Sequence, residues 1–273
     1  PGIEIEPLSG WIIYANYRWK FDADGFSNHE AKVYGTFVDG TKLALRPYNF
    51  FEVNQGHGYY NSPNIYSSYH KLLGKHDFTI LAGFEQELYT LESNYSRKDN
   101  LISDKLPSLG TATGKEYASG SRIHWATRSF FGRLNYAFAD KYLIELSGRR
   151  DGSSRFPRGR RWGIFPSGSL SCILSRENFW ESLSKYVSYA KIRASYGALG
   201  NQDIENYLFI ERLPIYSNPP LPYIIGNERP TYVGMAPLNS PSLTWEKVNT
   251  TNTGIDLGFL NNKLNISFDY FMR

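Results

Sequence analysis

The stretch FFGRLNYAFADKYLIELSGRRD, residues 130–151, decides the fold. Apolar or small side chains occupy its even positions from 130 to 138 and from 142 to 148, on both sides of a turn at 139–141. Polar and charged side chains, such as Arg133 and Glu145, occupy odd positions. Successive side chains of a strand point to opposite faces. The pattern therefore predicts a hairpin of two antiparallel strands with one apolar and one polar face.

The same alternation recurs along the chain and predicts about nine strands in all. The other segments are 11–20, 64–73, 78–87, 162–174, 190–198, 251–259 and 264–270. A continuous apolar face either packs on a second layer or meets lipid as the outer face of a barrel. Contacts of Leu146, Leu170 and Ile192 with a second protein layer would indicate the first case.

The connections between these segments favour the barrel, because short and long ones alternate along the chain. Short turns are expected at 74–77, 139–141 and 261–263, and long loops at roughly 22–58, 97–120 and 200–243. Segment 175–186 is predicted to form one or two helical turns, with Ser175 as the N-cap. Short turns on one side and long loops on the other are typical of an outer-membrane barrel.

Composition narrows the class of protein further. Of the 273 residues, 16% are aromatic, which suits the aromatic girdles of a membrane barrel, and no run approaches the length of a spanning apolar helix. The net charge of +4, without a long basic run, gives no support for nucleic-acid binding. The single cysteine, Cys172, excludes an internal disulfide and a cysteine-based zinc site. We interpret the chain as a fragment that is cut at both ends, and we therefore expect residues 1–273 to be part of a single domain.

The sequence contains few candidate catalytic or ligand-binding residues. The histidines are scattered, and no HExxH, GxSxG or phosphate-binding loop occurs, so we expect neither an enzyme nor a cofactor or metal site. The best candidates for contact with cargo or a lid are aromatic residues in the proline-rich loop 200–243 and two polar residues near the strand ends. These are Tyr207, Phe209, Tyr216, Tyr223, Tyr232, Arg155 and Asn201. A solvated loop tip is the competing interpretation for Arg155 and Asn201, and a loop-internal aromatic cluster is the competing one for the rings.

Several strings resemble those of SusC/RagA-type TonB-linked outer-membrane transporters of Bacteroidetes. They begin at Phe131, Arg149, Trp162, Ser175, Lys191 and Asn239 and read FGRLNYAFADKYL, RRDGSSRFP, WGIFPSGS, SRENFW, KIRASYGALGNQDI and NSPSLTWEKVNTTNTGIDLGFLNNKLNISFDYF. Two departures are local: SCIL at Ser171 replaces a frequent Gly-Trp pair, and Ser240 interrupts the usual Asn-Pro.

The resemblance implies an all-β fold, a transmembrane antiparallel barrel of roughly 22 strands of which this chain supplies fewer than half. It implies a plug domain outside this chain, outer-membrane localisation in a Gram-negative bacterium, and contact with membrane lipid. It also implies a SusD-like surface lipoprotein as lid and energy from the TonB complex through the missing N-terminal part. The implied function is active import of an oligosaccharide or oligopeptide. Alternatives are an outer-membrane barrel enzyme or adhesin and a soluble carbohydrate-binding β-sandwich.

Overall fold

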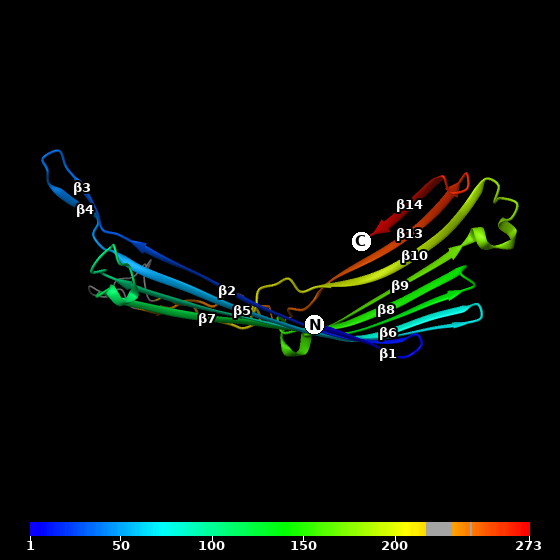
Figure 1. Cartoon of the computed structure of the whole chain (residues 1–273), viewed down its shortest axis with the longest axis horizontal. Helices are drawn as coiled ribbons and strands as arrows, with labels where there is room; N and C mark the ends of the chain where they lie inside the picture. The colour runs from blue at the N-terminus through cyan, green and yellow to red at the C-terminus, as the bar shows by residue number, and fades with distance from the viewer. Residues whose placement is uncertain (217–230, 241) are drawn as a thin grey trace. The chain divides into compact units, whose positions relative to one another are not determined.

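The protein consists almost entirely of antiparallel strands (Figure 1). The structure is a computed structural model that describes residues 1–216, 231–240 and 242–273. Its main strands are β1 (Gly2–Leu8), β2 (Trp11–Glu30), β5 (Phe50–Leu73), β6 (His76–Asp99), β7 (Glu116–Phe138), β8 (Tyr142–Ser153), β9 (Trp162–Ile173), β10 (Val187–Asn201), β13 (Glu246–Phe259) and β14 (Leu264–Met272). No helix among the described residues has the length and apolar character needed to cross a membrane.

These ten strands form a single sheet in the order β1-β2-β5-β6-β7-β8-β9-β10-β13-β14. Each main strand therefore pairs with its neighbour along the chain, and two small hairpins are inserted. These hairpins are β3 (Val33–Thr36) with β4 (Lys42–Arg46), and β11 (Ile215–Tyr216) with β12 (Tyr232–Val233). The all-β, antiparallel fold predicted from the alternation is confirmed. Strand β1 was not predicted: Ile3, Glu4, Ile5 and Glu6 do alternate, but the run is short and Pro7 interrupts it.

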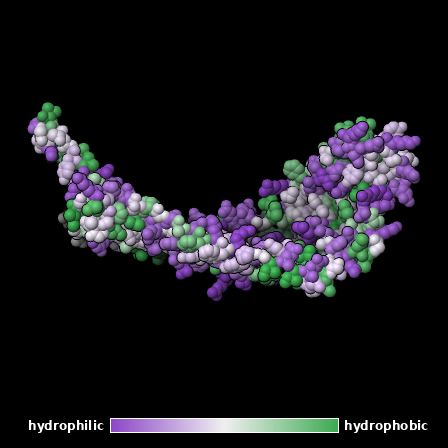
Figure 2. All heavy atoms as spheres, in the orientation of Figure 1, coloured by the Kyte–Doolittle hydropathy of each residue, from purple (hydrophilic) through white to green (hydrophobic). Residues whose placement is uncertain are grey.

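The strand register places the apolar side chains of successive strands on one face. One row across the sheet contains Phe138, Tyr142, Cys172, Ile192, Ile255 and Phe268. Leu146, Leu170 and Ile192 are 52%, 57% and 44% exposed, so no second protein layer covers them among the described residues. Figure 2 shows hydrophobic atoms at the surface of this part of the sheet. This exposure argues against a soluble sandwich, in which such residues would be buried.

The tight turns are built by residues with positive φ. Ala139 and Asp140 have φ values of 50° and 54°, and Asn261 and Asn262 have 56° and 63°. Two successive positive φ values are the geometry of the two-residue turns that match the twist of a hairpin. Gly74, with φ of 61°, serves the turn between β5 and β6. The three predicted short turns are therefore confirmed, and they lie at the same end of the sheet in Figure 1.

The connection 174–186 contains two short 3₁₀ helices, η3 (Leu174–Arg176) and η4 (Asn178–Trp180). The prediction of one or two helical turns is confirmed, but Ser175 lies inside η3, whose N-cap is Ile173. Strand β9 ends at Ile173, one residue before the end of the predicted segment 162–174, so the helical connection starts earlier than predicted. Glu177 anchors this segment: its carboxylate is 3.3 Å from Lys141 Nζ. The Tyr142 hydroxyl and the Lys141 ammonium hold the pKa of Glu177 below its usual value.

The chain divides into two compact units. The first contains Pro1–Asn16, Pro63–Gln86 and Ala126–Arg273, and the second contains Tyr17–Ser62 and Glu87–Trp125. The predicted long loops 22–58 and 97–120 fall in the second unit, and much of each is strand: β2 extends to Glu30, β5 starts at Phe50, β6 reaches Asp99 and β7 starts at Glu116. That prediction was wrong because apolar and polar residues do not alternate regularly at these strand ends, so they lack the pattern that indicates a strand.

A small core stabilises the second unit. Asn49 is buried, and its side chain bonds the backbone of Leu101 twice: Nδ2 donates to Leu101 O at 3.1 Å, and Oδ1 accepts from Leu101 N at 2.9 Å. The Arg97 guanidinium lies 3.7 Å from the ring centre of buried Phe50. Buried polar groups are tolerated when they are hydrogen-bonded in this way.

Candidate functional site

The polar face of the first unit is hollowed between β5 and β10. The hollow has a volume of about 560 Å³. Its side chains come from the odd positions of β7, β8 and β9 and from neighbouring strands. The lining includes Asn64, Tyr66, Phe131, Arg133, Ser147, Arg149, Asp151, Phe165 and Ser167. Aromatic rings and charged groups thus share one concave surface, the usual composition of a ligand site.

Arg149 contacts two carboxylates and an aromatic ring in this hollow. Its Nη2 lies 3.6 Å from Glu85 Oε2, and its Nε lies 3.2 Å from Asp151 Oδ1. The guanidinium also lies 5.5 Å from the ring centre of Phe131. Two carboxylates and a ring hold the side chain in one orientation, which is the arrangement of a pre-organised contact point rather than a freely rotating surface arginine.

Ion pairs balance charge elsewhere on the polar face. Arg193 on β10 bridges two strands: its Nε is 3.2 Å from Asp256 Oδ2, and its Nη1 is 2.6 Å from Asp269 Oδ1. Arg133 Nε and Glu145 Oε1 are 4.0 Å apart. These cross-strand ion pairs link β7 to β8 and β10 to β13 and β14.

An aromatic cluster closes one end of the hollow. Phe156, Phe165 and Trp245 are buried, and both phenylalanine rings lie 5.3 Å from the Trp245 ring, centre to centre. Trp245 Nε1 donates to Arg161 O at 2.8 Å, so the indole also satisfies its polar group. We call Phe156, Phe165 and Trp245 the rim cluster.

Two glycines make room for the rim cluster. A Cβ atom at Gly200 would lie 2.1 Å from Phe165 Cζ, and one at Gly163 would lie 2.4 Å from the same atom. Both separations are far inside van der Waals contact, so the Phe165 ring rests directly on the backbone of β9 and β10. Between β6 and β7, the ring of Phe131 covers Gly83 in the same way, and a Cβ atom there would lie 2.4 Å from Phe131 Cζ.

Sequence reasoning did not single out the rim cluster. Its three members come from three strings quoted above, RRDGSSRFP, WGIFPSGS and the string beginning at Asn239. A signal was available: Phe131 and Phe165 are large aromatic residues at odd positions of strands whose odd faces are otherwise polar. An aromatic ring on the polar face of an alternating strand, with glycines nearby, indicates a packed contact on that face.

The structure connects the two predicted polar residues to the start of the loop 200–243. Arg155 Nη1 donates to Gln202 O at 3.2 Å and Arg155 Nε to Asn206 Oδ1 at 3.2 Å. Asn201 ends β10, and its Nδ2 donates to Glu246 Oε2 at 3.0 Å. Both side chains thus tie the base of the loop to neighbouring strands.

The predicted loop aromatics are spread along the loop. Tyr216 and Tyr232 stack across the β11–β12 hairpin, with ring centres 4.9 Å apart. Tyr207 has a φ of 65°, and the Arg212 guanidinium lies 5.0 Å from its ring centre. Phe209 is half-buried, and Tyr223 lies outside the described residues. The structure therefore pairs two of these rings with each other.

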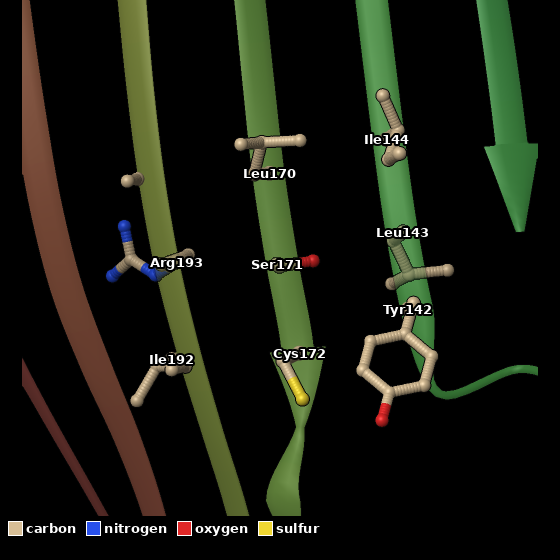
Figure 3. A pocket seen from close by; sticks show the side chains of 9 residues that line it. Tyr142, Leu143, Ile144, Leu170, Ser171, Cys172, Ile192 and Arg193 are labelled. Carbon is tan, nitrogen blue, oxygen red and sulfur yellow. The ribbon is translucent and has the colours of Figure 1, made fainter.

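The apolar face carries a separate shallow groove. Figure 3 shows side chains of β8, β9 and β10 around it. Tyr142, Ile144, Leu170, Cys172 and Ile192 supply its apolar surface. An open groove between rows of apolar side chains suits flexible hydrocarbon, and Ser171 and Arg193 are the polar residues in its lining.

Comparisons with known proteins fit this two-faced sheet. The model of the family described as "TonB dependent receptor-like, beta-barrel" matches residues 7–273. The chain is similar to TonB-dependent receptor P39 of Formosa agariphila, with 35% identity over 73% of the chain. It is also similar to TonB-dependent receptor SusC of Bacteroides thetaiotaomicron, with 30% identity over 96% of the chain. It covers 18% and 26% of the lengths of these relatives, and so spans about a quarter or less of each.

A solved structure of the RagAB peptide transporter has the same fold. The TM-score is 0.80 and the identity 24%, over 98% of this chain and 28% of the other. A second structure, of the RagAB peptide importer in its open-open state, gives a TM-score of 0.78 at 25% identity, over 98% of this chain and 28% of that one.

Proposed function

Because this chain belongs to the family of TonB-dependent receptor-like β-barrels, we propose that it forms part of the wall of an outer-membrane transporter. The whole protein imports a large nutrient, an oligosaccharide or oligopeptide, with energy from the TonB complex and a SusD-like lipoprotein as lid. It resides in the outer membrane of a Gram-negative bacterium and performs no covalent chemistry on its cargo. The relatives named above are receptors and transporters, which supports this class of function.

The dimensions of the apolar face support a membrane-spanning wall. On β7, the even-numbered face runs from Phe130 to Phe138, and on β8 it runs from Tyr142 past Leu146 to Arg150. Each run covers eight residue steps, or about 26 Å along the strand, and about 20 Å of height at a tilt near 40°. Aromatic residues stand at both ends: Phe130 and Trp162 stack at 6.2 Å, and Phe138 and Tyr142 at 6.4 Å. An apolar band between aromatic girdles is the outer surface of such barrels.

The single observation that carries the proposal is the concave polar face opposite this band. Its arginines are neutralised in cross-strand pairs, and its rings lie flat on glycines, so the surface is both hydrated and rigid. A wall that faces a water-filled or plugged lumen needs this combination. The hollow around Arg149 is the best-formed contact point for a plug or a passing cargo.

We place the ends of the long strands and the loop 200–243 on the extracellular side, opposite the tight turns. The loop is the proposed contact for lid or cargo through Tyr207, Phe209, Tyr216, Tyr223 and Tyr232, with Arg155 and Asn201 holding its base. Stacked rings such as Tyr216 and Tyr232 suit sugars and peptides alike. All of residues 1–273 belong to one barrel domain in this proposal, and further strands complete the barrel beside β1 and β14.

The proposal is tested by uptake in cells that make the full-length protein. A deletion strain, a complemented strain and a complemented strain without TonB receive fluorescent oligosaccharide or oligopeptide mixtures. We expect uptake of one of the two classes in the complemented strain only. Full uptake in the deletion strain, or uptake that is independent of TonB, would overturn the proposed function.

The role of the loop is tested separately by deleting residues 208–232 in the same protein. The flanking strands β10 and β13 pair over their whole length, so we expect the barrel to remain inserted. Co-purification of the lid lipoprotein or uptake of cargo should fall. Unchanged lid binding and uptake in a correctly inserted protein would show that the loop is a passive cover.

A further inference from the structure

The apolar face carries two arginines that differ from those of the polar face. Arg128 on β7 and Arg150 on β8 are exposed, and neither pairs with a carboxylate among the described residues. On the polar face, Arg133, Arg149 and Arg193 each have a carboxylate partner. Arginines without an acidic neighbour on an otherwise apolar surface are available to bind an anion from elsewhere.

The register places these two arginines beside each other. Arg128 is opposite Gly152, and Arg150 is opposite Phe130 and Ile164, so the arginines are diagonal neighbours on adjacent strands. Diagonal neighbours on one face are about 7 to 8 Å apart, which lets two long side chains reach a common ligand.

The arginines stand at the end of the apolar band, next to its aromatic girdle. Trp162 lies opposite Gly152, and its indole leans across that glycine, where a Cβ atom would lie 2.9 Å from the ring. The Arg150 guanidinium lies 4.8 Å from the Trp162 ring centre. The ring of Phe130 follows on the membrane side and packs on Phe84 at 5.3 Å. Arg128 and Trp162 thus share one row across the strands, and Arg150 shares the next row with Phe130 and Ile164. Arginines, an indole and the first apolar side chains meet at this end of the band, as they do at the boundary between headgroups and hydrocarbon.

A hollow of about 260 Å³ opens beside Arg128 on this face. Gln86, Arg128, Ser154, Arg161 and Trp162 line it, and its lining includes no carboxylate. Arg128 Nε donates to Gln86 Oε1 at 3.1 Å, which orients the guanidinium and leaves its terminal amino groups for a ligand. The Ser154 hydroxyl accepts from Ala126 N at 2.9 Å and retains a proton to donate. The hollow is therefore cationic, rich in donors and partly preformed.

We propose that Arg128 and Arg150 bind the phosphate group of a membrane lipid, with Ser154 as a further donor and its acyl chains on the apolar band below. The inference rests on the proposed function, because it requires this face to lie against the membrane. Guanidinium groups bind phosphate oxygens bidentately, and a site at the edge of the hydrocarbon layer presents them at the depth of headgroups. Apolar side chains immediately below favour a lipid-borne phosphate over a free one.

The test uses the full-length protein in detergent and native mass spectrometry, which counts bound lipids. The probes are phosphatidic acid, diacylglycerol with the same chains, and inorganic phosphate. The site variant is R128Q/R150Q. The matched control is R158Q/R160Q, which removes the same charge from the exposed helix η2 (Arg158–Arg160) outside the hollow. Heat-modifiable gel migration reports whether each variant is folded.

We expect the wild type to bind phosphatidic acid at least tenfold more tightly than diacylglycerol. R128Q/R150Q should lose that preference by about tenfold or more, and R158Q/R160Q should keep it within about twofold. Equal losses in both variants, no loss in the site variant, or displacement of the lipid by equimolar inorganic phosphate would each overturn the lipid site. If these failures occur in a protein that inserts into the outer membrane and imports its cargo, the proposed function stands and only this inference falls. A protein that does not reach the membrane overturns both.

Discussion

Leu146→Arg should separate the two faces of the sheet most clearly. Leu146 lies on β8, four residues from Tyr142 and four from Arg150. Four strand residues cover about 13 Å, or about 10 Å of height at a tilt near 40°, so the side chain sits near the middle of the apolar band. This is the depth at which a charge in a barrel wall is most costly.

The magnitude follows from two contributions. An arginine near the midplane on the lipid face costs about 2 to 4 kcal/mol. Leu146 is 52% exposed, and the loss of roughly half of a leucine side chain's transfer free energy adds about 1 kcal/mol. The expected loss in free energy of unfolding is therefore about 3 to 5 kcal/mol.

Ser147→Arg is the matched control on the polar face. Ser147 Oγ lies 2.7 Å from Ser167 Oγ, so the change removes one hydrogen bond, worth about 1 kcal/mol, and leaves the new charge in water. Both variants are made in the full-length protein, reconstituted in phospholipid vesicles and unfolded in guanidinium chloride, with tryptophan fluorescence and gel migration as readouts. Equal losses for the two variants, or a larger loss for Ser147→Arg, would refute the assignment of the apolar face to lipid.

Three further predictions concern the rim and the turns. Phe165→Ala removes a ring that is 6% exposed and should lower the free energy of unfolding by about 3 to 5 kcal/mol, as measured by the same titration. Gly200→Ala forces the Phe165 ring from its seat and should cost about 1 to 3 kcal/mol; a double-mutant cycle should show that this cost disappears in a Phe165→Ala background, and a persistent cost would contradict the contact. The lowered pKa of Glu177 means that its contribution to stability is complete above its unfolded pKa near 4.3 and is lost as the pH falls through the lower folded value. Glu177→Gln should remove that part of the acid dependence in urea titrations between about pH 2 and 6, and an unchanged profile would show that the contacts of Glu177 with Tyr142 and Lys141 have no energetic effect.

The alternation of apolar and polar residues predicted the strand segments that form the apolar band. From residue 130 to the C-terminus, one face of each strand is apolar and the other polar, so a shift of one residue would place charges on the apolar face. The turn at Ala139 and Asp140 was predictable because its residues stand between two clear alternations. The ends of β2, β5, β6 and β7 in the second unit were not predictable, because their apolar residues, such as Phe50 and Phe51, do not alternate with polar ones.

The candidate site was predictable only in part. Arg155 and Asn201 were chosen for their position at strand ends, and the structure shows them fastened to the base of the loop. Phe165 and Trp245 escaped notice because their contact depends on the pairing of β9, β10 and β13 and not on any local spacing. Long-range contacts of this kind leave only indirect traces in a single sequence, such as glycines on the strands that the rings cover.

The hydrogen bond from Trp245 to Arg161 joins residues separated by 84 positions along the chain. Between them lie β9, β10 and the loop 200–243, so the indole reaches its pocket only after those strands have paired. Because the entropy of closing so long a segment must be met before the contact forms, the rim should be among the last regions to become ordered during assembly. The burial of Trp245 therefore reports on this late step. In a refolding experiment, the fluorescence of Trp245 should change after the circular-dichroism signal of the β-sheet has appeared.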